Sequence, residues 1–243
     1  MRVPRYRIYL VMYGGVGISV VIASVLRFTA AHDTLRVVVS SEGVRAALGI
    51  VAFWTAAGLR MAFISPGNQR GGWLFRAIHG RPPEYKVAME ELAGAKVWAL
   101  VCTAGVTAVS FAALRAISPW QLVTWPATAA QIVTAAGMCL LLADVFFLKV
   151  TTVAFTGAPR EQESLAFTML KFFTFFPFVI WLPLVCEPWM ERGVWNLTAA
   201  VAGIGASHLL LESKHRKVVR EFCELIWPED REEEFPMRLG LRY

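Results

Sequence analysis

The sequence is poor in charge. Only 17% of its 243 residues are Asp, Glu, Lys or Arg, whereas 56% are hydrophobic and the mean hydropathy is +0.52. Soluble domains carry about 25% charged residues, so the composition argues against a soluble domain. The net charge is +6, but the basic residues lie at the ends of apolar runs and do not form one basic face. This pattern argues against nucleic acid as a partner.

Cysteines and catalytic motifs are also scarce. The chain contains no CxxC, no HExxH, no GxSxG, no GxxxxGK[ST] and no GxGxxG before a helix, and its four histidines are scattered. We therefore predict no metal site, no cofactor and no ATPase within this chain. Small apolar packing is the favoured role of the cysteines, with a redox or metal role as the alternative. The four cysteines are Cys102, Cys139, Cys186 and Cys223.

Long apolar runs are what the sequence has in abundance. Their length of about twenty residues is that of a helix crossing a bilayer, and no alternating strands of an outer-membrane barrel are visible. The fold class we predict is all-α, a polytopic membrane helix bundle of about six spans in residues 1–213, with a cytoplasmic tail at 214–243. Pro126 separates a short interfacial piece from the fourth span, whose length leaves room for another count. The spans are predicted near residues 9–28, 44–64, 97–117, 127–148, 164–190 and 193–211.

The first apolar run also has the basic start of a secretory signal. It extends from Ile8 to Leu26, which is longer than a signal core of about 7–15 residues, and no small-x-small cleavage site follows it. We therefore interpret it as a retained first span. Small residues at a spacing of four predict close helix approach in the first and last spans. They are Gly15, Ser19 and Ala23, and Ala199, Gly203 and Ser207.

The distribution of Lys and Arg predicts the orientation. Most basic residues lie near the N-terminus, between the second and third spans, between the fourth and fifth spans, and in the tail. Such asymmetry favours a cytoplasmic location for both termini. The basic residues on the opposite side are Arg27, Arg36, Arg45, Arg115 and Arg192.

The connection at residues 65–96 is predicted to be a cytoplasmic helical loop. A short interfacial helix ends at Gly80, Pro82 and Pro83 form a rigid corner, and a second helix then continues without interruption into the third span. If the loop couples the protein to a partner, its exposed and interfacial side chains would make the contact. The candidate coupling residues are Trp73, Arg76, His79, Arg81 and Glu84.

Among the ionisable residues inside the predicted spans, four stand out, all toward the cytoplasmic side. They are Arg60, Asp144, Lys171 and His208. Ionisable groups are costly in lipid and usually face the bundle interior, so these residues predict a polar cluster that handles a proton, an ion or an anionic head group. The alternative is structural: Arg60 and Lys171 snorkel, while Asp144 pairs with Lys171 to fasten two helices.

Two further segments have specific predictions. Prolines 177, 183 and 188 interrupt the fifth span, which is typical of transport sites and also of ordinary bent spans. The sixth span is predicted to continue past the membrane as an amphipathic helix that ends at Pro228, with Lys217 and Glu221 paired on its solvated face.

Four stretches resemble those of a group of uncharacterised bacterial multi-pass membrane proteins. They are "GLRMAF", "WLFR", "LKFFTFFPF" and "EEEFPMRLGLRY". The similarity covers most of the chain and implies a protein of the bacterial inner membrane, but it implies no activity. The layout of six spans with both termini inside also resembles the membrane subunit of exporters of the ATP-binding cassette type, in which a cytoplasmic helix after the second span touches the ATPase.

These observations lead to three functional hypotheses. The first is a permease-like membrane component of a transport or export assembly, with membrane lipids and a separate cytoplasmic ATPase or other protein as partners. The second is an enzyme that acts on lipid head groups at the cytoplasmic face, with Asp144 and His208 as acid and base. The third is a membrane scaffold that docks a soluble partner through its tail.

Overall fold

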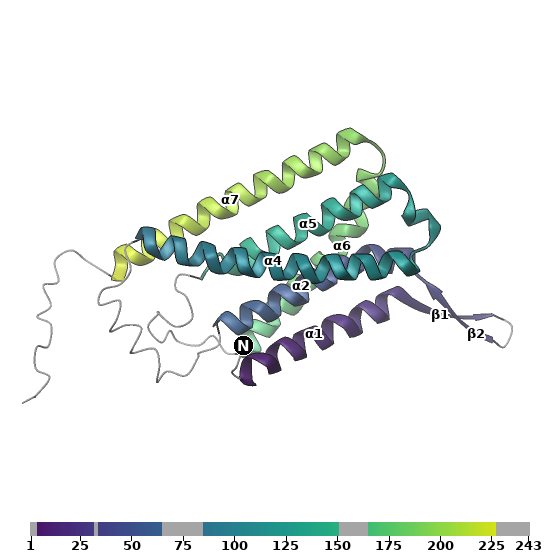
Figure 1. Cartoon of the computed structure of the whole chain (residues 1–243), viewed down its shortest axis with the longest axis horizontal. Coiled ribbons are helices and arrows are strands. Elements are labelled where there is room, and N and C mark those ends of the chain that lie inside the picture. The colour runs from purple at the N-terminus through teal and green to yellow at the C-terminus, as the bar shows by residue number, and fades with distance from the viewer. Residues whose placement is uncertain (1–3, 32–33, 65–84, 151–164, 227–243) are drawn as a thin grey trace, which may run out of the picture.

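The chain forms a bundle of long helices with one small β-hairpin (Figure 1). The computed structural model describes residues 4–31, 34–64, 85–150 and 165–226. The helices are α1 (Pro4–Val25), α2 (Ser41–Ile64), α4 (Tyr85–Ile117), the 3₁₀ helix η1 (Trp120–Val123), α5 (Trp125–Phe147), α6 (Leu165–Met190) and α7 (Val194–Ile226). The predicted all-α class is confirmed.

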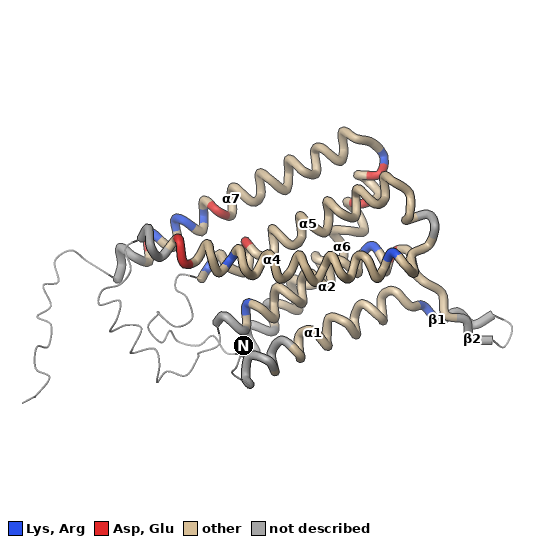
Figure 2. Tube along the Cα trace, viewed as in Figure 1, with Lys and Arg blue, Asp and Glu red and all other residues tan. Residues whose placement is uncertain are grey.

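Five of these helices, α2, α4, α5, α6 and α7, are long and apolar enough to cross a membrane. The sixth long helix, α1, has 22 residues and carries a shorter apolar stretch, Val11–Val25. Figure 2 shows that the charged residues of the described segments lie toward the two ends of the bundle, with a long uncharged middle between them. This is the distribution that a membrane helix bundle requires.

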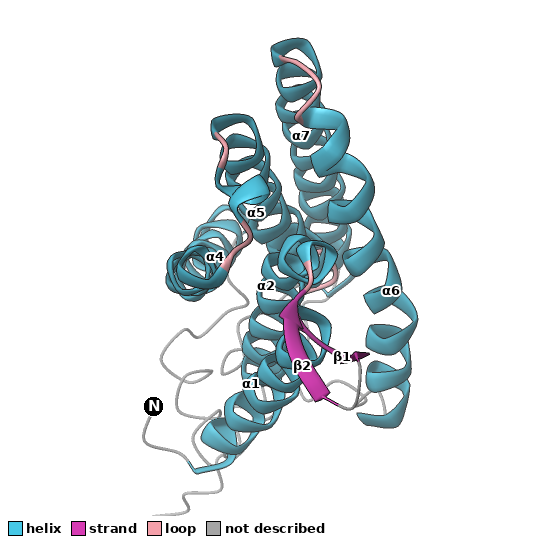
Figure 3. Ribbon diagram, turned by 90° about the vertical axis from the view of Figure 1, so that its right-hand side faces the viewer, coloured by secondary structure: helices cyan, strands magenta, loops and turns pink. Residues whose placement is uncertain are grey.

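Helix α2 is the centre of the bundle. Its residues Ile50, Ala52, Phe53 and Ala57 are completely buried, and it packs against α1, α4, α5 and α6. The ring of Phe53 lies 5.3–6.4 Å from five aromatic rings, those of Trp54, Phe146, Phe172, Phe175 and Phe176. Seen along the bundle in Figure 3, α7 lies at the edge, and most of its length is exposed to the surroundings.

The hairpin corrects the prediction for the first span. Helix α1 ends at Val25 rather than Phe28, and β1 (Leu26–Ala31) pairs antiparallel with β2 (Thr34–Val39), with Arg27 opposite Val38. The backbone N–H of Ser40 donates to the Val25 carbonyl at 2.8 Å and closes the base of the hairpin. Short apolar runs are compatible with either helix or strand, and β2 contains three consecutive β-branched residues, Val37, Val38 and Val39, which favour a strand.

Other predicted boundaries agree with the helices. Helix α4 runs without interruption from Tyr85 to Ile117, and η1 precedes α5, whose first turn contains Pro126. Helix α6 is continuous through its three prolines. Helix α7 continues past residue 211 into the tail, and Lys217 pairs with Glu221 at 3.8 Å on an exposed face.

The small-residue stripe predicted for α1 is on the wrong face. Gly15 and Ser19 are exposed, whereas Gly17 faces α2 so closely that a Cβ there would lie 2.9 Å from the Trp54 Cβ. Gly17 must be small because it lies opposite the large side chain of Trp54. A spacing of four between small residues in the sequence does not show which of them faces such a neighbour.

Candidate functional site

Three helices bring ionisable side chains together near one end of the bundle. We call this the terminal end, because α1 begins and α7 finishes there, and the opposite end the hairpin end (Figure 1). Lys96 comes from α4, Asp144 from α5, and His208 and Glu212 from α7. His208 and Glu212 are four residues apart, so they share one face of α7. We call these four residues the terminal network.

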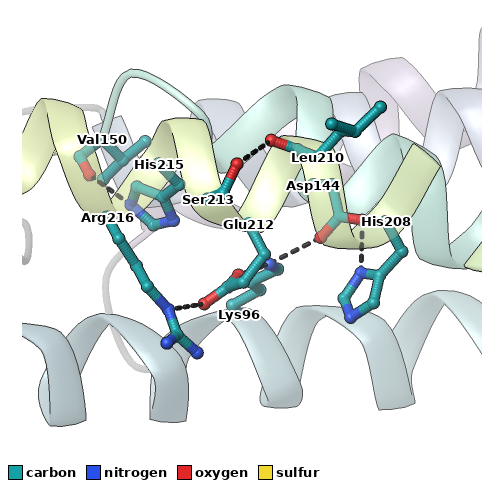
Figure 4. Close-up of polar contacts among 9 residues, drawn as sticks. All are labelled: Lys96, Asp144, Val150, His208, Leu210, Glu212, Ser213, His215 and Arg216. Atoms are coloured by element: carbon teal, nitrogen blue, oxygen red, sulfur yellow. Dashed lines mark hydrogen bonds and ion pairs between the residues drawn. The ribbon is translucent and has the colours of Figure 1, made fainter. Parts of the chain in front are cut away.

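Asp144 is the centre of the terminal network. Its Oδ1 forms an ion pair with Lys96 Nζ at 2.6 Å, and its Oδ2 lies 2.7 Å from His208 Nδ1. Lys96 Nζ also contacts Glu212 Oε2 at 2.7 Å. The Asp144 side chain is 1% exposed and that of Lys96 is 13% exposed, so water does not screen their contact (Figure 4).

The charges of the terminal network balance once Arg216 is included. Arg216, one helical turn after Glu212, donates from Nε to Glu212 Oε1 at 3.2 Å. Lys96 and Arg216 supply two positive charges against the two carboxylates of Asp144 and Glu212. Buried charges persist only when they are paired, and here each carboxylate has a cation. Protonation of either carboxylate would leave a cation in excess.

The two histidines near the network have different roles. Asp144 binds Nδ1 of His208, and Nε2 has no hydrogen-bond partner among the described residues. The ring points away from α7, and its side chain is 33% exposed (Figure 4). His215 is buried, and its Nε2 donates to the Val150 carbonyl at 3.2 Å. His208 therefore has one ring nitrogen without a protein partner in the described segments, whereas His215 holds Val150, three residues after α5, against α7.

The residues predicted for the intramembrane cluster lie as follows. Asp144 and His208 are in contact. Arg60, on α2, has its Cζ 5.8 Å from the centroid of the Phe146 ring, where the guanidinium makes a cation–π contact. Lys171 is on α6, and its side chain lies outside what the structure describes, so its pairing with Asp144 stays a prediction.

Lys96 and Glu212 were not selected from the sequence. They lie directly outside the predicted spans, one residue before residue 97 and one residue after residue 211, and so they looked like ordinary boundary charges. One signal points to Glu212, which shares a helix face with His208. An ionisable residue at a span boundary can therefore belong to the buried site when its helix packs inward there.

Several predicted functional residues lie outside the described segments. They are the coupling residues Trp73, Arg76, His79, Arg81 and Glu84, and the tail from residue 227 onward. The coupling and scaffold hypotheses for these segments therefore stay predictions. Within the described ranges, no group of three or more His, Cys, Asp or Glu side chains is placed to hold a metal ion.

Comparison with models of protein families, with curated proteins and with solved structures finds no match to this chain. The chemistry of the terminal network is therefore the basis for assigning a function.

Proposed function

We propose that the protein is a permease-like membrane component of a transport or export assembly in the bacterial inner membrane. The observation that carries the proposal is the buried carboxylate of Asp144, which binds Lys96 of one helix and His208 of another. Ionisable groups inside membrane helices are expensive, and they mark substrate, ion and proton pathways more often than they serve stability.

The network links charge to helix position. Neutralising Asp144 removes the ion pair between α4 and α5 and weakens the contact between α5 and α7, while Lys96 keeps its contact with Glu212. A proton or a charged substrate that reaches Asp144 would therefore favour a state in which α4 and α7 have moved relative to α5. Such differential stabilisation is what a ligand needs in order to drive a conformational change.

The energy for transport would come from a partner. The chain has no GxxxxGK[ST] phosphate-binding loop, so the proposal assigns ATP hydrolysis to a separate cytoplasmic protein. The helical connection at residues 65–96 is the proposed contact, by analogy with the exporter layout that the chain resembles. Membrane lipids would surround the exposed apolar faces of α4, α6 and α7.

The test is to purify the tagged protein from membranes of its own host and to identify the ATPase retained with it. The complex is then reconstituted in vesicles, and ATP hydrolysis is compared for wild type, Asp144→Asn and the exposed control Glu221→Gln. We expect all three proteins to retain the ATPase and only Asp144→Asn to lose stimulated hydrolysis. Retention of no ATPase, or equal hydrolysis by all three proteins, would contradict the proposal.

An enzyme acting on lipid head groups is the second candidate, because one observation favours it. A carboxylate that orients a histidine through Nδ1 leaves Nε2 available as a general base, and Asp144 and His208 have this arrangement. The measurement is the lipid composition of cells that carry wild type or His208→Gln. A lipid species that accumulates only in the variant would favour the enzyme over the permease.

A further inference from the structure

A second buried ionic group lies at the hairpin end of the bundle. It joins Arg45, in the second turn of α2, to Glu187 and Glu191, which are one turn apart near the end of α6. The two helices are in close contact beside it. A Cβ on Gly49 would lie 3.0 Å from the Val179 carbonyl oxygen and 3.3 Å from Pro183 Cγ. The backbones therefore hold the three charged side chains in a narrow space.

The two carboxylates share one cation unequally. Arg45 Nη1 is 2.5 Å from Glu191 Oε1 and 3.3 Å from Glu187 Oε2. Glu191 is 25% exposed and can also contact water, whereas Glu187 is 0% exposed. Its second oxygen, Oε1, is buried and has no hydrogen-bond partner among the described residues. Arg45 therefore neutralises Glu191 better than Glu187.

No other charge is available to Glu187 in the described structure. The charged groups that face it are Arg45 from α2 and Glu191, the residue directly after α6. Helices α5 and α7 also pack against α6, but within the described ranges they supply no ion pair to Glu187. If both carboxyl groups were ionised, the site would hold one negative charge in excess, in a place that water does not reach.

We propose that Glu187 is a proton-binding group that carries a proton on its carboxyl at neutral pH and releases it reversibly. A neutral carboxylic acid with one unpaired oxygen costs far less in a buried site than an ionised carboxylate without its own cation. Release of the proton leaves a negative charge at the α2–α6 contact, so it favours a state in which this part of α6 is closer to water. The inference depends only on this contact, and it is independent of the proposed transport function.

Infrared difference spectroscopy tests this proposal on the full-length protein in lipid vesicles. A protonated carboxyl gives a C=O stretching band that a carboxylate lacks and that shifts in heavy water. We expect wild type to show such a band at neutral pH, to lose it at alkaline pH and to regain it on return. Glu187→Gln should lack the band, and the matched control Glu191→Gln should keep it.

Three results would overturn the proposal. One is the lack of any Glu187-dependent protonated band at neutral pH, and another is loss of the band in Glu191→Gln instead. The third is loss of the band on adding NaCl at constant pH, which would mean that the site exchanges metal cations. If Glu187→Gln does not insert, Glu187→Asp replaces it, because this variant keeps the carboxyl and should move the band without abolishing it.

Discussion

Lys96 contacts carboxylates on two different helices, Asp144 on α5 and Glu212 on α7. A lysine can do this because its ammonium group has three donors at the end of a flexible chain. Its position at a span boundary lets the charge reach inward while the first turns of α4 remain toward the end of the bundle. At the residue scale, the terminal network therefore depends on the ammonium group of Lys96 and the carboxylate of Asp144.

The first prediction concerns Asp144. Asp144→Asn removes the buried charge that pairs with Lys96 and binds His208, so it should lower the free energy of unfolding by about 3 kcal/mol, the cost of breaking a buried pair. The measurement is thermal or denaturant unfolding in mild detergent.

The control for Asp144→Asn is Glu221→Gln. It also removes one carboxylate from an ion pair, but the pair with Lys217 is exposed. Because exposed pairs contribute little, its effect should stay below about 0.5 kcal/mol. If the two variants had the same free energy of unfolding, the terminal network would not stabilise the fold.

At the scale of elements, glycines decide where helices approach. Gly43, in the first turn of α2, accepts no side chain, because a Cβ there would overlap the carbonyl oxygen of Ser24 at the end of α1. Its backbone N–H also donates to Ser40 Oγ at 3.2 Å. The turn between the hairpin and α2 is therefore packed against the last turn of α1.

The second prediction concerns Gly43. Gly43→Ala should destabilise the fold by about 1–3 kcal/mol, because backbone atoms must move to admit the methyl group. Gly105→Ala is the matched control, since a Cβ at Gly105 meets nothing within 4 Å and alanine is the better helix former. Thermal unfolding of both variants in detergent measures the difference. If Gly43→Ala had the stability of wild type, the end of α1 would not lie where the structure places it.

The third prediction tests the contact between α4 and α5. Cys139 Sγ is 3.5 Å from Thr107 Oγ1, which is close enough for a disulfide after Thr107→Cys. A membrane-permeable oxidant should therefore remove two free thiols from this variant, and a reductant should restore them. Mass spectrometry after alkylation counts the thiols.

Thr103→Cys is the control for this crosslink. Thr103 is buried one turn earlier on α4, and its hydroxyl donates to the Ala99 carbonyl rather than to α5. The Thr103→Cys variant should keep all its free thiols under the same oxidation. Crosslinking of both variants, or of neither, would contradict the register of α4 against α5.

At the scale of the whole molecule, the two ends of the bundle differ. The terminal end holds the Lys96–Asp144 network, while the hairpin end holds the Arg45 group and the exposed Arg27–Glu42 pair. The six long helices place the beginning of α1 and the end of α7 at the same end (Figure 1).

The fourth prediction is the orientation. Because basic residues concentrate on the side of both termini, reporter fusions at Tyr243 and after Gly80 should report the cytoplasm, and a fusion near Ser40 should report the periplasm. Paired reporters that are active on opposite sides of the membrane make the measurement. A periplasmic signal at Tyr243 would overturn the assignment of both termini.

Much of the fold could be predicted because the helix is a local structure. In lipid, each span must satisfy its own backbone hydrogen bonds, so the length of an apolar run is enough to predict a helix. Pro126 marked the start of α5, and the apolar face after residue 85 marked the continuous α4. The hairpin was missed because strand pairing joins residues from two segments and leaves a weak signal in either one.

The candidate site was predicted only in part for a related reason. The cost of burying charge identified Asp144 and His208, since it depends on their position within an apolar run. The partners Lys96 and Glu212 depend on how far α4 and α7 are rotated and shifted against α5, and no local pattern encodes that geometry. The Arg45–Glu187–Glu191 group was missed for the same reason, because its residues are 142 and 146 positions apart in the chain.

The amino-acid sequence by itself determined that this protein is a bundle of membrane-spanning helices with a few ionisable groups inside, because hydrophobic run length and the cost of buried charge are local properties. Only the tertiary structure decided which charges meet: Lys96 with Asp144 and Glu212 at one end, and Arg45 with Glu187 and Glu191 at the other. The physical reason is that ion pairs act over a few ångströms, and such distances between helices are set by packing around α2.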